Sequence, residues 1–109
     1  MATFHLIYLC FVIMNRKVQI KEMIKQVIAS HLSGNYNAFI FGSQAGLPEL
    51  KRADIDIGIN AGRPLTCLEE SLIWNALEDM PTLYKFDLVD FNKAEEKFKK
   101  IALQNIEMI

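Results

Sequence analysis

Residues 54–59 read Asp-Ile-Asp-Ile-Gly-Ile, and this alternation predicts a β-strand with one strongly apolar face. Because successive side chains of a strand point to opposite faces, the isoleucines enter the core together while Asp54 and Asp56 share the other face. Two carboxylates beside a core repel each other and lose hydration, which is unfavourable unless a cation neutralises them. The sequence therefore predicts a cation site on the polar face of this strand.

The spacing of apolar residues predicts the other elements. Helical periodicity marks a first helix, short apolar runs between turn residues mark strands, and Thr66 with Glu69 fits the capping box of a second helix. In chain order we predict a helix over 18–32, a strand over 37–41, a loop over 44–53, a strand over 54–59, a helix from 66 that ends before Pro81, a strand over 84–91 and a last helix. This order indicates one α/β (α+β) unit, with a mixed sheet of about three or more strands packed against helices.

The last predicted helix follows Asn92, which has Glu95 three positions later and is read as its cap. Its apolar residues recur at helical spacing and are expected to share one buried face: Phe98, Ile101, Ala102 and Ile106.

Composition limits the classes of function. The chain has 109 residues, 51% of them hydrophobic, which suffices for a single packed core. Its 12 basic and 13 acidic residues give a formal net charge of −1, so no overall positive charge favours direct binding of nucleic acid. The two cysteines, Cys10 and Cys67, match neither a disulfide framework nor a metal-binding cluster, and we expect a reduced, cytoplasmic chain.

The N-terminal segment MATFHLIYLCFVI is almost entirely apolar. It is too short to span a bilayer and lacks the features of a signal peptide, so we expect no membrane association. Two interpretations remain open, an extra element packed on the domain or an extension ahead of a true start at Met14. We divide the chain into an extension over 1–13 and a domain over 14–109.

A third acid lies on the strand predicted at 84–91. Asp87 stands among apolar residues in mid-strand, whereas Asp90 has the opposite orientation at the strand's exit and is expected to be exposed. We therefore group Asp87 with Asp54 and Asp56. Magnesium suits such a group, because it binds a few carboxylates and completes its coordination with water and substrate phosphate oxygens.

Gly42-Ser43 directly follows the strand predicted at 37–41. Glycine lets a phosphate approach the backbone closely, and the serine hydroxyl with the following amides can hold phosphate oxygens. A lone Gly-Ser pair is a weak signal. It gains specificity from the Asp-x-Asp segment, which begins at Asp54, twelve residues after Gly42 (54 − 42 = 12). The combination predicts a phosphate-binding site beside the acids.

The segments Phe39-Ile40-Phe41-Gly42-Ser43 and Asp54-Ile55-Asp56, with Asp87 downstream, resemble the polymerase-beta-type nucleotidyltransferase superfamily. The resemblance is strongest to its minimal nucleotidyltransferases, which are encoded beside HEPN-domain proteins in toxin–antitoxin pairs. It implies a nucleotidyltransferase-like mixed sheet. Many relatives have Arg after Gly-Ser and Ser before Asp-x-Asp, where this chain has Gln44 and Ala53. Two interpretations of Lys51 and Arg52 stay open: either residue supplies the missing contact to the triphosphate from the loop, or both are solvated loop residues.

The resemblance also implies roles. Asp54 and Asp56, with Asp87, would bind Mg²⁺ and ATP, Gly42 and Ser43 would hold the terminal phosphates, and Asp87 would help activate an acceptor hydroxyl. The expected function is transfer of AMP onto a hydroxyl of a HEPN-domain partner, within a possible hetero-oligomer. The alternative is a non-catalytic antitoxin that neutralises its partner by binding alone.

Overall fold

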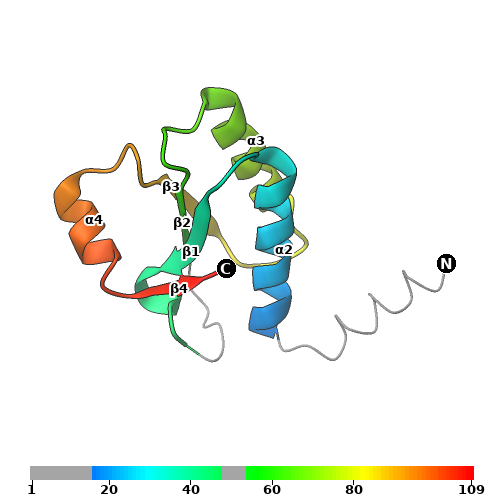
Figure 1. The fold of residues 1–109 in the computed structure, drawn as a ribbon. Coiled ribbons are helices and arrows are strands. Elements are labelled where there is room, and N and C mark those ends of the chain that lie inside the picture. Colours follow the sequence, from blue (N-terminus) through cyan, green and yellow to red (C-terminus); the bar gives the residue numbers. More distant parts are fainter. Residues whose placement is uncertain (1–15, 48–53) are drawn as a thin grey trace.

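The computed structural model describes residues 16–47 and 54–109 of the chain (Figure 1). The elements are helix α2 (Arg16–His31), strand β1 (Asn37–Phe41), the 3₁₀ turn η1 (Gly42–Gln44), strand β2 (Ile55–Asn60), helix α3 (Cys67–Glu78), strand β3 (Phe86–Asp90), helix α4 (Glu96–Ala102) and strand β4 (Ile106–Met108). The extension predicted over 1–13, and Lys51 and Arg52, lie outside the described residues. Within the described residues, no helix is long and apolar enough to cross a membrane.

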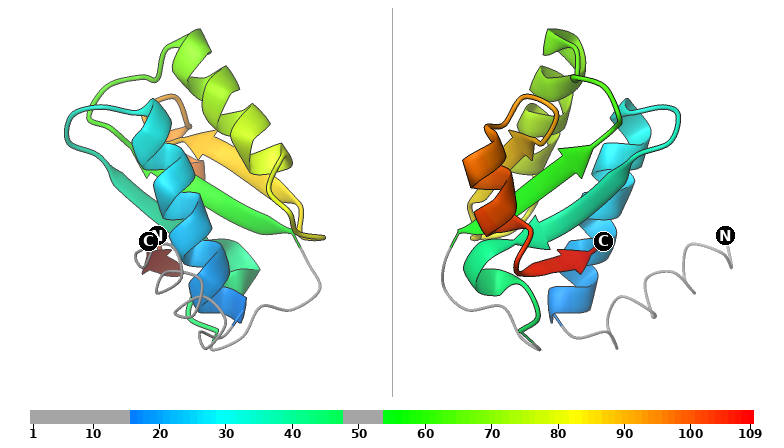
Figure 2. Two further views of the ribbon diagram at one scale, coloured as in Figure 1. Left: turned by 90° about the vertical axis from the view of Figure 1, so that its right-hand side faces the viewer. Right: turned by 60° about the vertical axis from the view of Figure 1, so that its left-hand side comes forward.

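The strands form a mixed four-stranded sheet in the order β3-β2-β1-β4. Strand β1 is antiparallel to both of its neighbours, whereas β2 and β3 are parallel. Helices α2 and α3 cover one face of the sheet, and the short helix α4 lies on the other (Figure 2). The α/β class and the mixed sheet predicted from the sequence are confirmed.

The two faces of the sheet have different interiors. The isoleucines of β2 are fully buried under α2 and α3, where they meet a cluster of other aliphatic residues that includes Ile24, Ile28 and Ile73. The opposite face carries an aromatic cluster, in which the Phe39 and Phe91 rings meet edge to face at 4.8 Å. Strand alternation therefore separates an aliphatic core from the face that carries Asp56, as the sequence predicted.

The end of the chain differs from the prediction. Helix α4 begins at Glu96 with Glu95 as its N-cap, and Asn92 instead donates a hydrogen bond from Nδ2 to Oδ1 of Asn60 at 3.1 Å. Ile106 lies in β4, where it pairs with Phe41, because the edge of β1 offers backbone partners that helical spacing cannot reveal. Of the predicted apolar face, Ala102 is buried, whereas Phe98 and Ile101 are exposed by 41% and 70%.

Ion pairs around Glu107 connect strand β4 to helix α2. Lys17, only 5% exposed, and Lys21 donate to the two carboxylate oxygens of Glu107 at 2.5 and 2.8 Å. The Gly46 amide donates to the same carboxylate at 2.9 Å. Burial raises the pKa of Glu107, but these hydrogen bonds outweigh burial and lower it to about 2.

This cluster predicts an acid-sensitive contribution to stability. A carboxylate whose folded pKa is depressed stabilises the fold above its unfolded pKa, and that contribution is lost as pH falls through the folded pKa. We expect Glu107→Gln to lower the free energy of unfolding by about 2–3 kcal/mol at pH 7, because Lys17 keeps a buried charge without its counter-ion. The deficit should shrink as pH falls from 4.5 towards 2 in chemical denaturation series.

Glu22→Gln, on helix α2, also removes one carboxylate charge but lies outside the cluster, so it serves as the control. A deficit for Glu107→Gln that stays constant from pH 7 to pH 3, or equals that of Glu22→Gln, would contradict the assignment.

Candidate functional site

The predicted site residues meet at one end of the sheet. Because β1 and β2 are antiparallel, the end of β1 lies beside the start of β2, and the parallel strand β3 also starts there. Phe41 pairs with Asp56, and Asp56 pairs with Asp87. Directly paired residues point to the same face, so the side chains of Asp56 and Asp87 are neighbours on the face that carries α4.

The three acids differ in their surroundings. Asp54 is exposed and directly precedes β2, although the sequence predicted it as the first residue of that strand. Asp87, expected among apolar residues, is exposed near the start of β3, and Asp56 is half-buried between strands. Burial raises the pKa of Asp56, and the carboxylates of Asp87 and Asp54 raise it further. The structure thus brings all three together closely enough to interact.

Gly42 is packed against this group. Its φ is +79°, and a Cβ built on it would lie 2.8 Å from Oδ2 of Asp56. Glycine therefore meets two demands at once, a left-handed backbone and close approach of a carboxylate. The Gly-Ser turn and the Asp-x-Asp strand, separate in sequence, form one contact surface.

The turn η1 presents Ser43 to solvent beside the acids. The amide of Ala45 donates to the carbonyl oxygen of Gly42 at 3.2 Å and closes the turn. Gln44, which occupies the position of the Arg found in many relatives, is only 1% exposed and points into the protein. Ser43 is therefore placed to meet a ligand, whereas Gln44 serves the packing of the turn.

Asp90 has a structural role, and the expectation that it is exposed was wrong. It is 6% exposed, and its carboxylate accepts hydrogen bonds from the amides of Leu65 at 2.7 Å and Asn92 at 2.9 Å. These contacts hold the start of the α3 segment and the turn after β3. A carboxylate at a strand's exit can satisfy loop amides of distant segments, which strand spacing does not reveal.

The donors present fit a magnesium ion shared with a substrate. Within residues 16–47 and 54–109, no three His, Cys, Asp or Glu side chains are gathered closely enough to hold a metal by themselves. Mg²⁺ is typically bound through one or two carboxylates plus substrate phosphates rather than by an all-protein cage. Asp56, with its raised pKa and neighbouring carboxylates, supplies such a partial set of hard oxygen donors.

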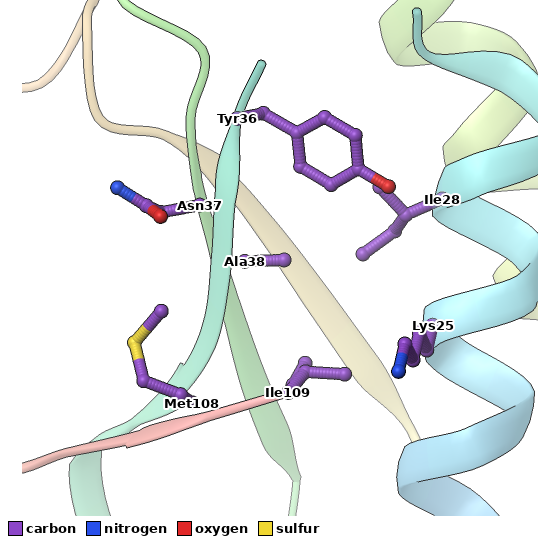
Figure 3. Close-up of a pocket in the computed structure, with 7 residues that line it drawn as sticks. All are labelled: Lys25, Ile28, Tyr36, Asn37, Ala38, Met108 and Ile109. Carbon is purple, nitrogen blue, oxygen red and sulfur yellow. The ribbon is translucent and has the colours of Figure 1, made fainter. Parts of the chain in front are cut away.

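A pocket of about 230 Å³ lies elsewhere, between α2 and the start of β1 (Figure 3). Its lining residues include Lys25, Tyr36 and Asn37, but no aspartate or glutamate. Since Asn37 begins β1 and Gly42 follows its end, this pocket is at the opposite end of the strand from the acids. We therefore place the candidate site at the acids.

Sequence reasoning missed the residues that support the turn. Asn105 donates from Nδ2 to the carbonyl oxygen of Gly42 at 3.1 Å, and Glu107 accepts from the Gly46 amide. These contacts join positions about sixty residues apart through single hydrogen bonds, and the sequence contains no periodic signal for them.

The packing of Gly42 against Asp56 predicts a local effect of Gly42→Ala. The free energy of unfolding of this variant should be about 1 kcal/mol lower, because alanine is strained in a left-handed conformation. The added Cβ should also displace the Asp56 carboxylate. Gly34 and Gly62, with φ of +83° and +72° and no atom within 4 Å of an added Cβ, provide alanine controls with strain alone. In carboxyl NMR titrations, the Asp56 midpoint should move only in Gly42→Ala. An unchanged midpoint would show that the contact is unimportant.

The acids also predict opposite effects of two Asp→Asn substitutions. In the metal-free protein at pH 7, Asp56→Asn should leave stability unchanged or raise it by up to about 1 kcal/mol, after solvent screening, because it removes repulsion. Asp90→Asn should lower it by about 1–3 kcal/mol, since an amide N–H would face a backbone donor. Equal losses in urea denaturation would mean that Asp56, too, is structural.

Known proteins share both the sequence pattern and the fold of this chain. The sequence matches the family described as "Polymerase beta, Nucleotidyltransferase" over residues 19–109. No protein of curated function matches it. Among solved structures, the fold is similar to a chain in the complex of a tri-AMPylated Shewanella oneidensis HEPN toxin with its MNT antitoxin, with a TM-score of 0.63 and 17% identity over 82% of this chain and 67% of that chain.

Two further structures give a TM-score of 0.67, each over 81% of this chain and 70% of the other. One is a toxin–antitoxin complex with AMP-PNP, at 18% identity. The other is an MntA–HpeT complex, at 16% identity, with two Asp→Glu substitutions separated by one residue, the spacing found in Asp54-Ile55-Asp56. At these identities the likeness is one of fold. Because the family match spans most of the sequence, the chain belongs to the polymerase-beta nucleotidyltransferase family.

Proposed function

We propose that this protein is a magnesium-dependent nucleotidyltransferase that transfers AMP from ATP to a hydroxyl of a HEPN-domain toxin and thereby acts as its antitoxin. The observation that carries the proposal is the placement of Asp56 beside Asp87 and against Gly42 at one end of the sheet. Family membership supports the chemistry. The AMPylated HEPN toxin found with an MNT antitoxin of similar fold supports the acceptor.

Different residues would bind the triphosphate and the metal. Ser43 and the amides of η1 donate hydrogen bonds to the terminal phosphates of ATP. Asp56, with Asp87 or Asp54 beside it, would hold Mg²⁺ jointly with the phosphates, and the bound ion would neutralise the carboxylates and the triphosphate. The raised pKa of Asp56 agrees with a site where, among residues 16–47 and 54–109, burial and neighbouring carboxylates rather than a counter-charge act on this acid.

The transfer itself forms one bond and breaks one. The acceptor oxygen attacks the α-phosphorus of ATP, the bond from that phosphorus to the oxygen bridging to the β-phosphate breaks, and pyrophosphate leaves. Asp87, exposed beside Asp56, accepts the proton of the acceptor hydroxyl. The protein's contribution is therefore alignment and one proton transfer.

The face beside the acids suits an acceptor carried by a protein. Phe41 is the strand neighbour of both Asp56 and Ile106, so the apolar surface of β4 begins close to the acids. Ile106 on β4, the neighbour of Phe41, is 38% exposed, and Ile101 on α4, which lies on the same face of the sheet, is 70% exposed. Exposed apolar groups next to a site that must receive a second substrate favour a macromolecular partner over a small polar one.

The proposal predicts a mass change in the partner. When the HEPN toxin is incubated with this protein, ATP and Mg²⁺, its intact mass should rise by one or more AMP groups. Asp56→Asn should reduce the rate at least a hundredfold, because the charges that bring metal and triphosphate together are lost. Asp79→Asn, at the exposed C-cap of α3, removes the same charge away from the site and should not alter the rate.

A binding-only antitoxin gives a different result. The partner's mass would not change, toxin activity would fall only at stoichiometric ratios, and Asp56→Asn would suppress it as well as the wild type. That combination would refute the enzymatic function.

A further inference from the structure

We propose that Asn105 and Glu107, at the start of the C-terminal strand, are positioning residues that hold the loop 42–46 in the shape that receives the triphosphate. The nucleotide part of this inference rests on the proposed function. The structural part rests on contacts that are independent of any ligand.

The two residues fix the loop at both ends. Asn105 donates to the carbonyl oxygen of Gly42 at 3.1 Å, and that oxygen also accepts the amide of Ala45 at 3.2 Å. Glu107 accepts from the amide of Gly46 at 2.9 Å. The loop is thus bound at its first and last residues by side chains from one short segment.

Glu107 is itself held in place. Lys17 is 5% exposed, and its ammonium donates to Glu107, to the carbonyl oxygen of Gln44 at 3.3 Å and to the carbonyl oxygen of Leu47. One buried cation therefore joins helix α2, the loop and β4. Partly buried ion pairs with several hydrogen bonds have well-defined geometry, which suits a support for a ligand loop.

The loop is confined from the other side by the acids. The position of Gly42 leaves a built Cβ only 2.8 Å from Oδ2 of Asp56, so the turn rests against the carboxylate. A shift of the loop would change the spacing between Ser43 and Asp56. The support from β4 therefore sets the distance between the phosphate-holding turn and the acids.

If Asn105 and Glu107 preorganise the loop, their loss should measurably weaken nucleotide binding. A loop that must be ordered by its ligand binds that ligand more weakly, because the cost of ordering is subtracted from the binding free energy. Losing one hydrogen bond of the Asn105 type should weaken binding about three- to tenfold. The fold should survive, because Asn105 is exposed and lies outside both cores.

The experiment compares Asn105→Ala with Asn92→Ala. Asn92 donates one side-chain hydrogen bond of the same length, 3.1 Å, to Asn60, which ends β2 at the opposite end from Asp56. Amide hydrogen exchange is measured without nucleotide, and the affinity for AMP-PNP with Mg²⁺ is measured by calorimetry. Melting temperatures establish that the variants are equally folded.

We expect Asn105→Ala to speed exchange of the Ala45 and Gly46 amides and to weaken AMP-PNP binding about three- to tenfold. Asn92→Ala should do neither. Unchanged exchange in the loop overturns the inference whatever happens to affinity, since Asn105 would then act by direct contact or not at all. Faster exchange with wild-type affinity overturns it as well.

The same measurements separate this inference from the proposed function. If the wild-type protein does not bind AMP-PNP with Mg²⁺, the proposed function is wrong, and the claim that the loop is held for a triphosphate falls with it. Loop exchange would still show whether Asn105 holds the loop.

Discussion

The site depends on the lateral pairing of β2 and β3. Parallel register sets Asp56 directly beside Asp87, and the antiparallel partner β1 ends at the same point with Gly42 against the Asp56 carboxylate. A register shift of one residue would move every one of these side chains to the opposite face. The isoleucines on the other face, fully buried beneath α2 and α3, make that shift prohibitively unfavourable. The aliphatic core thus fixes the geometry of a site with which it shares no side chain.

The acids on this chain have different functions despite their similar sequence context. Asp90 is buried and accepts hydrogen bonds from two backbone amides, so it stabilises the fold. Asp56 is half-buried beside other carboxylates, so it is a local source of repulsion. We propose that this repulsion, at the end of the sheet and next to a tight glycine turn, is relieved by a cation that binds together with an anionic ligand. The membership of the polymerase-beta nucleotidyltransferase family agrees with this organisation.

The sequence was sufficient for the elements with strong periodicity and for the face of the sheet on which Asp56 lies. Alternation around Asp56 defined which face is polar, and β1 was predicted with its observed bounds, Asn37–Phe41. The sequence was insufficient where contacts with distant segments determine the structure. Ile106 pairs with β1 rather than continuing a helix. Asp90 accepts a hydrogen bond from the amide of Leu65, which lies far from it in the sequence. Asn105 supports the turn through one hydrogen bond, which has no periodic signature. Local patterns predict faces and elements, whereas single long-range contacts require coordinates.

We propose that the acids of β2 and β3 and the Gly-Ser turn bind one metal–triphosphate unit. Substoichiometric Mn²⁺ added with AMP-PNP, followed by paramagnetic broadening of amide NMR signals, tests it most directly. We expect broadening to begin at Gly42, Ser43, Asp56 and Asp87 and to reach its full strength only when the nucleotide is present. Broadening centred on other carboxylates, such as Glu70 on α3, or no localised broadening, would contradict it.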